Sequence, residues 1–433
     1  MKTHKFIAAA IIAAGVAGSA SAQTVINITG ATAFRQVAHQ AILDSLDLAN
    51  RTYGYAGSNI GNAGMAMFKG TINAGVDEVI VRTSWSGSVA GIRAVVNQAN
   101  AVTYFANTAN NTALLTANGT ANMNATATTA NETTGNDICF ADNAQENTPF
   151  NAVTLSGGPV GVIVFVPVVN ETASITEGES ISTLQLRRLM TAGKAPLQFI
   201  TGNSSHNNKK IYWTGRNDLS GTRVIYNAEM GIGASGTVQQ YLVYPTTTNA
   251  TVSVSDVRLW PTGDGNNVSN IWGSETAGNG GYNSGGALVP VLQRTSTSVT
   301  ERDSANASVA SAVDAVLCTV ISVQDAEDIQ IGGGKVLAYN GVYIEPAALP
   351  TGISATDRAK VAKGDYTLWS YERLFYRDSV PDDTVKAAFI TLLEGQVTAS
   401  GNIGGNGLAI SDMRVSRSSS SDGGSLSVSL SLP

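Results

Sequence analysis

Residues 215–223 read GRNDLSGTR, and this stretch lies between a strand-like run and a run of helical periodicity. The run before it, residues 211–213, is IYW, and the run after it is VIYNAEMGI. A glycine-bearing turn between a strand and a helix points backbone N–H groups outward, with the positive end of the helix dipole behind them. The stretch therefore predicts a strand–turn–helix unit that can hold an anion.

Two similar units lie near the N-terminus. VINITG at residues 25–30 is followed by a run with apolar residues at helical spacing, residues 31–50. DEVIVRTSWSG at residues 77–87 repeats the scheme, and a helix is expected over residues 89–99. GVIVFVPVVN at residues 161–170 is nearly all apolar, as in a strand buried on both faces. Repeated units of this kind predict an α/β fold with a largely parallel sheet flanked by helices.

Later segments extend the pattern. DICFADNAQ at residues 137–145 predicts a strand with a polar end, and residues 366–377 predict a late strand. Residues 307–329 are expected to form a helix that leads into a strand. Residues 382–395 predict a closing helix that begins with an aspartate cap.

Two segments differ from the rest in composition. Residues 101–135 are a low-complexity tract of Asn, Thr and Ala with few large apolar side chains, so they are expected to form a surface insertion such as a β-hairpin. Residues 401–433 are a Gly/Ser-rich tail. From Arg417 onward this tail is expected to be disordered or to add a weak edge strand.

The N-terminus has the pattern of a secretory signal peptide. Residues 1–22 combine a short basic start, an apolar core and the small-residue cleavage site Ala20-Ser21-Ala22. The apolar core is too short for a membrane anchor, and no cysteine follows the cleavage point to carry a lipid. The expected product is a periplasmic or secreted protein that does not span a membrane.

The charge balance limits the class of partner. Without Lys2 and Lys5 the chain has 24 basic and 32 acidic residues, which is a net charge of −8. This charge argues against nucleic acid and anionic membranes as partners. An anion site in this chain must therefore act through local geometry, because the overall field repels anions.

No motif of catalysis, cofactor binding or metal binding is found. IGGGKV at residues 331–336 lacks the spacing and hydroxyl residue of a phosphate loop. His39 and His206 have no metal-ligand spacing and are interpreted as solvated residues. Cys139 and Cys318 lie in apolar runs where single buried cysteines are common, although a disulfide between them stays open. The sequence therefore favours a binding protein over an enzyme, with no cofactor.

Taken in order, these segments resemble the periplasmic phosphate-binding proteins of ABC importers, which have the type 2 periplasmic binding protein fold. The resemblance covers residues 25–395. Leu219 stands where the family usually has a glycine, a departure that can alter the turn. The most specific element is the pattern R-x-D-x-S-G-T, formed here by Arg216, Asp218, Ser220, Gly221 and Thr222.

The resemblance implies further ligand-binding residues. GATAF, after the first strand, matches one anion-binding loop of the family, and SWSGS matches another. DICFADNAQ matches the strand end that carries an aspartate in the family. The positions implied in this chain are Thr32, Ala33, Phe34, Ser86, Ser88 and Asp142.

These residue types suit a phosphate ion. Phosphate near neutral pH is largely a dianion that keeps one proton, and Arg216 can donate two charge-assisted hydrogen bonds to its oxygens. Asp218 is expected to hold the Arg216 guanidinium. Asp142 can accept the proton of phosphate, whereas sulfate offers no proton, so this carboxylate is expected to set specificity.

The resemblance also implies two α/β lobes with the anion in the cleft between them and hinge closure on binding. The first lobe is expected to comprise residues 23–165 and 360–400, and the second residues 166–359. The implied function is capture of inorganic phosphate by a monomer that delivers it to an ABC permease. Two alternatives stay open: another tetrahedral oxyanion, such as sulfate or molybdate, or a secreted surface or adhesion protein that reuses the fold.

Overall fold

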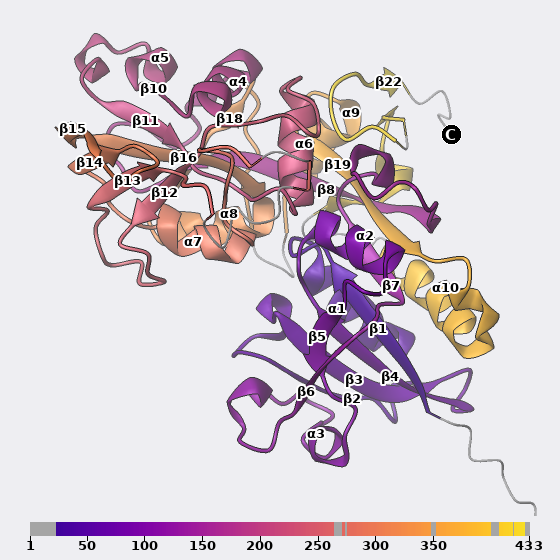
Figure 1. The fold of residues 1–433 in the computed structure, drawn as a ribbon. Coiled ribbons are helices and arrows are strands. Elements are labelled where there is room, and N and C mark those ends of the chain that lie inside the picture. The colour runs from indigo at the N-terminus through magenta and orange to yellow at the C-terminus, as the bar shows by residue number, and fades with distance from the viewer. Residues whose placement is uncertain are drawn as a thin grey trace, which may run out of the picture.

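The computed structural model describes residues 23–263, 271–272, 275–347, 352–399, 407–418 and 420–428. The expected signal peptide, residues 1–22, lies outside the described residues. Figure 1 shows two bodies joined by long strands, one built from the N-terminal part of the chain together with residues 384–398 and the other mainly from the middle of the chain. They are called here the first lobe and the second lobe.

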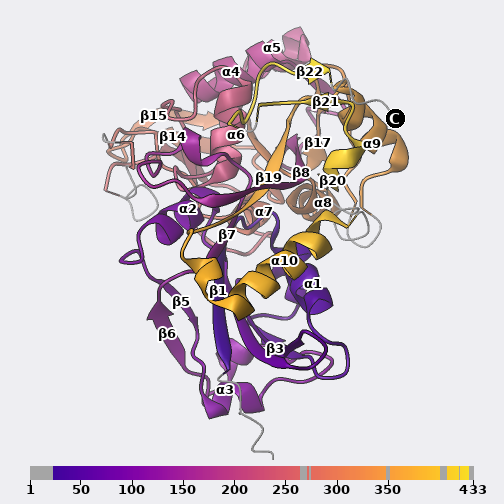
Figure 2. The ribbon, with the colours of Figure 1, turned by 90° about the vertical axis from the view of Figure 1, so that its right-hand side faces the viewer.

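The first lobe contains one end of a large 12-stranded sheet, with its strands in the order β7-β1-β4-β3-β2. The helices α1 and α10 pack against one face of this sheet, and α2 packs against the other. Figure 2 shows α10 lying across this lobe. The elements are β1 (Thr24–Gly30), α1 (Arg35–Ser45), β2 (Thr52–Tyr55), β3 (Met65–Ile72), β4 (Asp77–Ser84), α2 (Ser88–Val96), β7 (Ile138–Ala141) and α10 (Thr384–Thr398).

The second lobe combines one end of the large sheet with a separate four-stranded sheet, β12-β13-β14-β15. Its strands in the large sheet are β10 (Lys194–Pro196), β11 (Lys210–Trp213), β16 (Ala315–Ser322) and β17 (Lys335–Val336). The separate sheet consists of β12 (Tyr241–Tyr244), β13 (Asp256–Leu259), β14 (Val299–Arg302) and β15 (Ser308–Val313), and β9 (Ser180–Ile181) pairs with β18 (Ala338–Tyr339). The helices are α4 (Thr183–Ala192), α5 (Gln198–Thr201), α6 (Gly221–Glu229), α7 (Gly285–Leu292), α8 (Val323–Ile331) and α9 (Ala355–Lys363).

Two long antiparallel strands connect the lobes. β8 (Ser156–Val169) and β19 (Trp369–Tyr376) pair along most of their length, from Ser156–Tyr376 to Val164–Trp369. In the sheet, β19 lies between the start of β8 and β7 of the first lobe. The end of β8 pairs with β16 of the second lobe. The pairing is irregular between Glu372 and Arg373, where the chain passes between the lobes.

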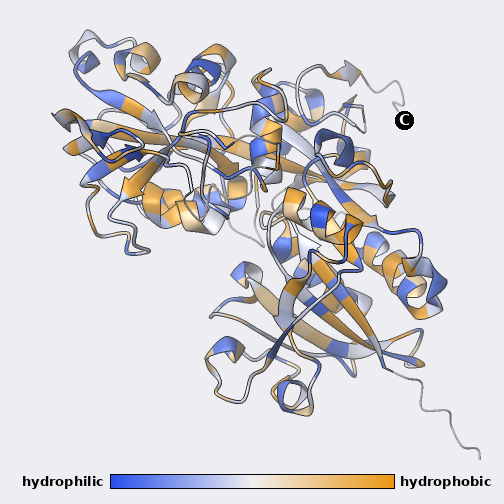
Figure 3. Ribbon diagram, viewed as in Figure 1, coloured by the Kyte–Doolittle hydropathy of each residue, from blue (hydrophilic) through white to orange (hydrophobic). Residues whose placement is uncertain are grey.

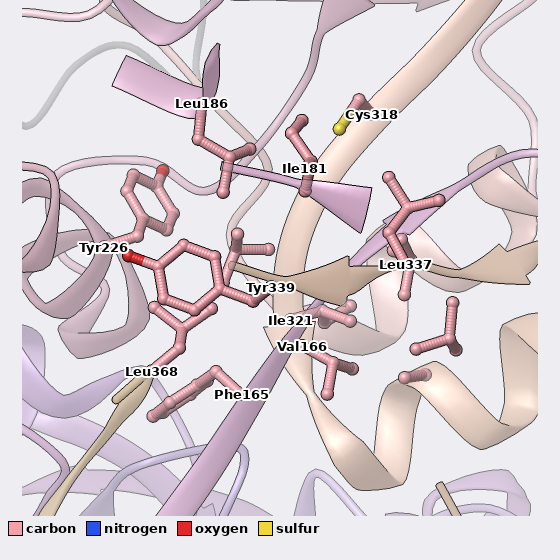
Figure 4. Close-up of a cluster of buried hydrophobic side chains, with 14 of the residues drawn as sticks. Phe165, Val166, Ile181, Leu186, Tyr226, Cys318, Ile321, Leu337, Tyr339 and Leu368 are labelled. Carbon is pink, nitrogen blue, oxygen red and sulfur yellow. The ribbon is translucent and has the colours of Figure 1, made fainter. Parts of the chain in front are cut away.

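Each lobe has its own hydrophobic core. The larger cluster fills the second lobe around β8, β11 and β16, and Figure 4 shows side chains from β8, β16, β18, α4 and α6 pointing toward one another in it. A second cluster lies between the first-lobe sheet and the helices α1 and α10. Figure 3 shows the apolar residues running along the central strands of both lobes. Separate cores allow the lobes to move as units about the connecting strands.

The structure confirms the α/β class, but the sheet is mixed and not mostly parallel. β1 pairs in parallel with β4 and β7, and β11 pairs in parallel with β16. β3 and β4 form an antiparallel hairpin whose turn, Asn73-Ala74-Gly75, has three consecutive residues with positive φ. Residues 307–329 were expected to be a helix followed by a strand, and they instead form β15, β16 and the start of α8.

The Asn/Thr/Ala-rich insertion contains the expected β-hairpin and also a small core. β5 (Val102–Phe105) and β6 (Asn131–Thr134) pair in antiparallel fashion, with α3 (Ala109–Ala113) between them. Phe105, Leu115 and Met123 are buried against Met67 and Ile80 of the first-lobe sheet. The insertion therefore covers part of this sheet instead of projecting from the surface.

From Arg417 onward, the described part of the C-terminal tail adds one short exposed strand, in line with the expected weak edge strand. β20 (Gly407–Leu408) pairs with β8, and β21 (Val415–Ser416) pairs with β22 (Ser427–Val428). Leu408, Met413 and Val415 belong to the second-lobe core. Among the helices of the described residues, none combines the length and apolar character needed to cross a bilayer.

His39 is buried, and its interpretation as a solvated residue is wrong. Its Nδ1 lies 2.8 Å from the Ile60 carbonyl oxygen, and its Nε2 accepts a hydrogen bond of 2.9 Å from Trp85 Nε1. Burial lowers the pKa of His39 to about 3, and this effect outweighs the Ile60 carbonyl, which raises it. The ring is therefore neutral in the folded protein, and it links α1 to the loop that precedes α2.

This burial predicts a pH-dependent loss of stability. Below pH 6.5 the unfolded chain binds a proton at His39 that the folded chain does not, so the free energy of unfolding falls as the pH drops toward 3. His39 should contribute a slope of up to about 1.4 kcal/mol per pH unit in this window. Urea unfolding between pH 7 and pH 4 measures it, and the deficit of His39→Gln relative to the native chain should shrink as the pH falls. The surface-loop substitution His206→Gln is the matched control, and equal pH dependence in both variants would contradict the assignment.

Candidate functional site

The first corner of the site follows β1. Gly30 has a φ of +120°, and a Cβ at this position would lie 1.9 Å from the carbonyl oxygen of Phe140 on β7. The next amide, Ala31 N, donates to the same oxygen at 2.8 Å. Thr32 and Phe34 are buried, and Ala33 packs against the second-lobe core. The corner is therefore fixed against the end of β7 and faces the other lobe.

The second corner is the loop between β4 and α2. Gly87 has a φ of +100°, and its N–H donates to the Gly30 carbonyl oxygen at 2.8 Å, so this corner is joined to the first. Ser86 Oγ lies 3.0 Å from Thr29 Oγ1. Ser88, the first residue of α2, is buried.

The third corner is the start of α6. The Ser220 hydroxyl caps the helix by accepting a hydrogen bond from Arg223 N at 3.4 Å. The Leu219 carbonyl oxygen accepts a hydrogen bond of 3.2 Å from Ala90 N of α2. A Cβ added to Gly221 would lie 2.6 Å from Ser88 Oγ. The starts of α2 and α6 therefore meet, although they lie more than 130 residues apart in the sequence.

Asp142 lies where these two helix starts meet. Its side chain is buried, and its Oδ2 accepts a hydrogen bond of 3.4 Å from Thr222 Oγ1. Its backbone N–H donates to Ser88 Oγ at 3.4 Å. The other carboxylate oxygen, Oδ1, is buried without a hydrogen-bond partner. It lies 2.3 Å from where a Cβ on Gly221 would be.

The pKa of Asp142 is raised to about 6. Burial is the main cause, since an ionised carboxylate is costly to remove from water. Its own backbone N–H and the charge of Arg216 act in the opposite direction, and the carboxylate of Asp422 raises the value. Asp142 can therefore change protonation state near neutral pH, and its Oδ1 has no hydrogen-bond partner among the residues that the structure describes.

Arg216 is held by backbone carbonyl groups. Its Nη2 donates to Asn283 O at 3.0 Å and its Nε donates to Tyr282 O at 3.3 Å. The guanidinium is buried, which lowers its pKa, while the carboxylates of Asp325 and then Asp142 raise it. The charge of Arg216 thus interacts with Asp325 on α8 of the second lobe and with Asp142, which follows β7 of the first lobe.

Asp218 does not hold Arg216, in contrast to the expectation. Its Oδ2 accepts a hydrogen bond of 3.1 Å from Ile271 N, and its charge acts on Arg223. Asp218 therefore supports the turn and the loop that follows the second-lobe sheet. Its expected role, to hold the Arg216 guanidinium, is therefore not the role that its described contacts give it.

Three features around Arg216 were missed by the sequence reasoning. Arg223 Nη1 donates to Arg216 O at 3.3 Å and to Asn279 O at 2.8 Å, and Gln240 Nε2 donates to Arg216 O at 3.1 Å. The chain between β13 and α7 supplies the carbonyl groups of Tyr282 and Asn283 that hold the Arg216 guanidinium. Arg223 was visible as the second arginine of GRNDLSGTR, but nothing in the sequence assigned a role to it.

The first corner faces the second lobe across a small groove. Thr32 and Ala33 line it from one side, and Ser322 and Asp325 line it from the other. Arg35 also lines this groove, and its charge lowers the pKa of Arg216 slightly, so the Arg216 guanidinium lies near it. The structure thus places all three corners around one region between the lobes.

The site has no features of a metal centre. Among the residues that the structure describes, no group of three or more His, Cys, Asp and Glu side chains is arranged to hold a metal ion. Cys139 and Cys318 are both free and buried, so they do not form a disulfide. Burial raises the pKa of both thiols.

No protein-family model matches the chain, and no curated protein matches it. Solved structures of phosphate-binding proteins cover most of it. A possible phosphate-binding protein from Planctomyces limnophilus covers 86% of this chain and 87% of its own, with 10% identity and a TM-score of 0.35. A human phosphate-binding apolipoprotein covers 89% and 90%, with 15% identity and a TM-score of 0.41.

A high-affinity periplasmic phosphate-binding protein, PfluDING, also covers 89% of this chain and 90% of its own, with 14% identity and a TM-score of 0.39. These three structures are described as phosphate-binding proteins, the class that the sequence motifs of this chain resemble. At these TM-scores the likeness is distant.

The contact between Gly221 and Asp142 predicts that no side chain is tolerated at position 221. Gly221→Ala should force the Asp142 carboxylate or α6 to move and destabilise the protein by about 1–3 kcal/mol, as overpacking does. Gly395→Ala is the matched control: Gly395 is an exposed helical glycine with no atom within 4 Å of an added Cβ, so it should stabilise by about 0.5–1 kcal/mol. Denaturant unfolding of both variants tests this, and an unchanged midpoint for Gly221→Ala would contradict the geometry.

Proposed function

We propose that the protein is an exported solute-binding protein that captures inorganic phosphate between its lobes for ABC import. The ligand is held by the three corners, which comprise Thr32, Ala33, Phe34, Ser86, Ser88 and Ser220 to Thr222, together with Arg216 and Asp142. Asp218 acts on the turn itself. No catalytic step is part of this proposal.

The observation that carries the proposal is the state of Asp142. A buried carboxylate oxygen without a partner is costly, and such groups in native proteins call for an explanation. Here the carboxylate lies near the Ser88 and Thr222 hydroxyls at the starts of α2 and α6, and the charge of the buried Arg216 guanidinium acts on it. A ligand with both acceptor oxygens and one proton satisfies all of these groups together, and hydrogen phosphate is such a ligand.

The surrounding donors fit the other oxygens of the ion. A guanidinium has five N–H donors, and the carbonyls of Tyr282 and Asn283 accept from two of the Arg216 nitrogens. The starts of α1, α2 and α6 add partial positive charge, about 0.3–1 kcal/mol for each helix. The site can therefore bind an anion although the protein as a whole is acidic.

The first test is direct binding. The mature protein should release heat on titration with phosphate, and Arg216→Gln should weaken binding by about 100-fold or more, because two charge-assisted hydrogen bonds are lost. Arg187→Gln, a substitution of an exposed arginine on α4, is the matched control and should bind as the native chain does. Absence of heat with millimolar phosphate in the native chain would refute the function.

The second test concerns selectivity and pH. Above pH 7 the ionised Asp142 should accept the phosphate proton and repel sulfate, with roughly thousandfold discrimination. As the pH falls through about 6, Asp142 gains a proton, becomes a donor, and should admit sulfate. Asp142→Asn should bind sulfate with little pH dependence.

Competition calorimetry at pH 8 and pH 5 measures both effects. Sulfate binding by the native chain that does not change between these pH values would contradict the role of Asp142. Stronger binding of sulfate or molybdate than of phosphate at pH 8 would instead assign the site to another tetrahedral oxyanion.

Delivery to a permease is the remaining part of the proposal, and the location of the protein tests it. An importer component is released with the periplasmic extract, whereas a surface or adhesion protein is recovered with the cell surface or the matrix.

A further inference from the structure

The C-terminal tail makes buried charged contacts that the proposed function does not use. β21 and β22 pair Val415 with Val428, which closes the intervening residues into a loop. Val415 packs in the second-lobe core, and both Val415 and Leu426 lie close to Gly364 at the end of α9. The segment formed by residues 415–418 and 420–424 is called here the strap.

One side of the strap holds the chain next to Asp142. The Asp422 carboxylate accepts hydrogen bonds of 2.9 and 3.1 Å from Ala144 N and one of 2.7 Å from Asn147 Nδ2. It also pairs with Arg373 at 3.2 Å, and both side chains of this pair are almost fully buried. Arg373 Nη1 in turn donates to the backbone carbonyl oxygen of Asp142 at 3.4 Å. Asp422 therefore fixes the corner at residues 142–144 from behind.

The other side of the strap holds the end of α6. Arg417 donates to Glu229 Oε2 from both Nη atoms at 3.2 Å, and its guanidinium lies 4.6 Å from the centre of the Trp369 ring. Gly424 N donates to the same carboxylate oxygen at 2.9 Å. A Cβ on Gly423 would lie 2.3 Å from Glu229 N, so the strap backbone lies directly against α6.

These contacts connect both ends of α6 to residues 142–147. At the start of α6, Thr222 bonds to Asp142, and at its end, Glu229 is joined through the strap to Ala144. α6 belongs to the second lobe, and residues 142–147 directly follow β7 of the first. Separation of the lobes at this point would have to break these buried ion pairs and hydrogen bonds.

We propose that the strap positions the two halves of the anion site relative to each other, with Asp422 as the positioning residue for the Asp142 corner and Arg417 as the positioning residue for α6. The effect of the strap on ligand affinity rests on the proposed function. The described hydrogen bonds and ion pairs of Asp422, Arg417 and Gly424 reach residues 144, 147, 373 and 229, and none of these is proposed to contact the ion. Its mechanical part, coupling between residues 142–147 and α6, is independent of any ligand.

Hydrogen–deuterium exchange tests the mechanical part without ligand. Asp422 bonds to residues 144 and 147 and to β19, so a local effect of Asp422→Asn would be confined to that side. The proposal expects about tenfold faster exchange at residues 221–229 as well. The reciprocal variant, Glu229→Gln, should speed exchange at residues 142–147. It also serves if Asp422→Asn does not fold.

The matched control is Asp412→Asn, which removes the same charge from an exposed position of the same tail and should leave both regions unchanged. If hydrogen exchange rises only beside the substituted residue in both variants, the proposed coupling between residues 142–147 and α6 is wrong. The tail would then stabilise only the residues that it contacts.

Phosphate calorimetry on the same variants tests the effect on the site. Asp422→Asn should weaken phosphate binding by about tenfold while Asp412→Asn does not. Native affinity in Asp422→Asn would overturn the positioning role. If the native chain itself binds no phosphate, the proposed function fails, and the strap is then judged on the exchange at residues 221–229 alone.

Discussion

The structure of the site depends on one buried contact, between the carboxylate of Asp142 and the start of α6. A carboxylate can be buried only where donors reach it, and here the Thr222 hydroxyl donates to Asp142 Oδ2 at 3.4 Å. Gly221 is the residue that lets α6 come this close, because any Cβ would meet the carboxylate. The contact joins the end of β7 to a helix of the other lobe, so it couples the relative position of the lobes to the state of a single ionisable group.

Local chemistry made the three corners predictable from the sequence. Each consists of an apolar strand, a polar turn with glycine or serine, and a helix of clear periodicity, and all of this is encoded within about 20 residues of chain. The placement of the corners beside one another was inferred only from family resemblance. Sheet direction was predicted less well, since the antiparallel pairing of β8 with β19 and β16 joins strands far apart in the sequence. The Asn73-Ala74-Gly75 turn is a local sequence signal of the β3–β4 hairpin.

The residues that hold Arg216 could not be predicted, for a physical reason. Carbonyl oxygens of residues 282 and 283 accept its hydrogen bonds, and every residue type carries such an oxygen. Asp218, whose side chain is distinctive in the sequence, bonds elsewhere. His39 shows the same limit: its neutral state follows from burial, and its partners Trp85 and Ile60 are brought to it by folding and not by sequence spacing. Sequence thus identifies side chains capable of a role more readily than the partners that assign it.

The acidic composition of the chain gives the buried network a further consequence. At physiological ionic strength, surface charges are screened beyond about 8 Å. The net negative charge of the surface therefore repels an anion mainly while the anion approaches through solvent, and less once it is inside the site. Within the site, Arg216 is flanked by Asp142 and Asp325, and Arg373 is paired with Asp422, so nearly every buried cation there already faces a carboxylate. Attraction for an anion therefore cannot come from an excess of positive charge. It must come from oriented donors at short range, and these depend on the lobes being held in register by the contacts on both sides of α6.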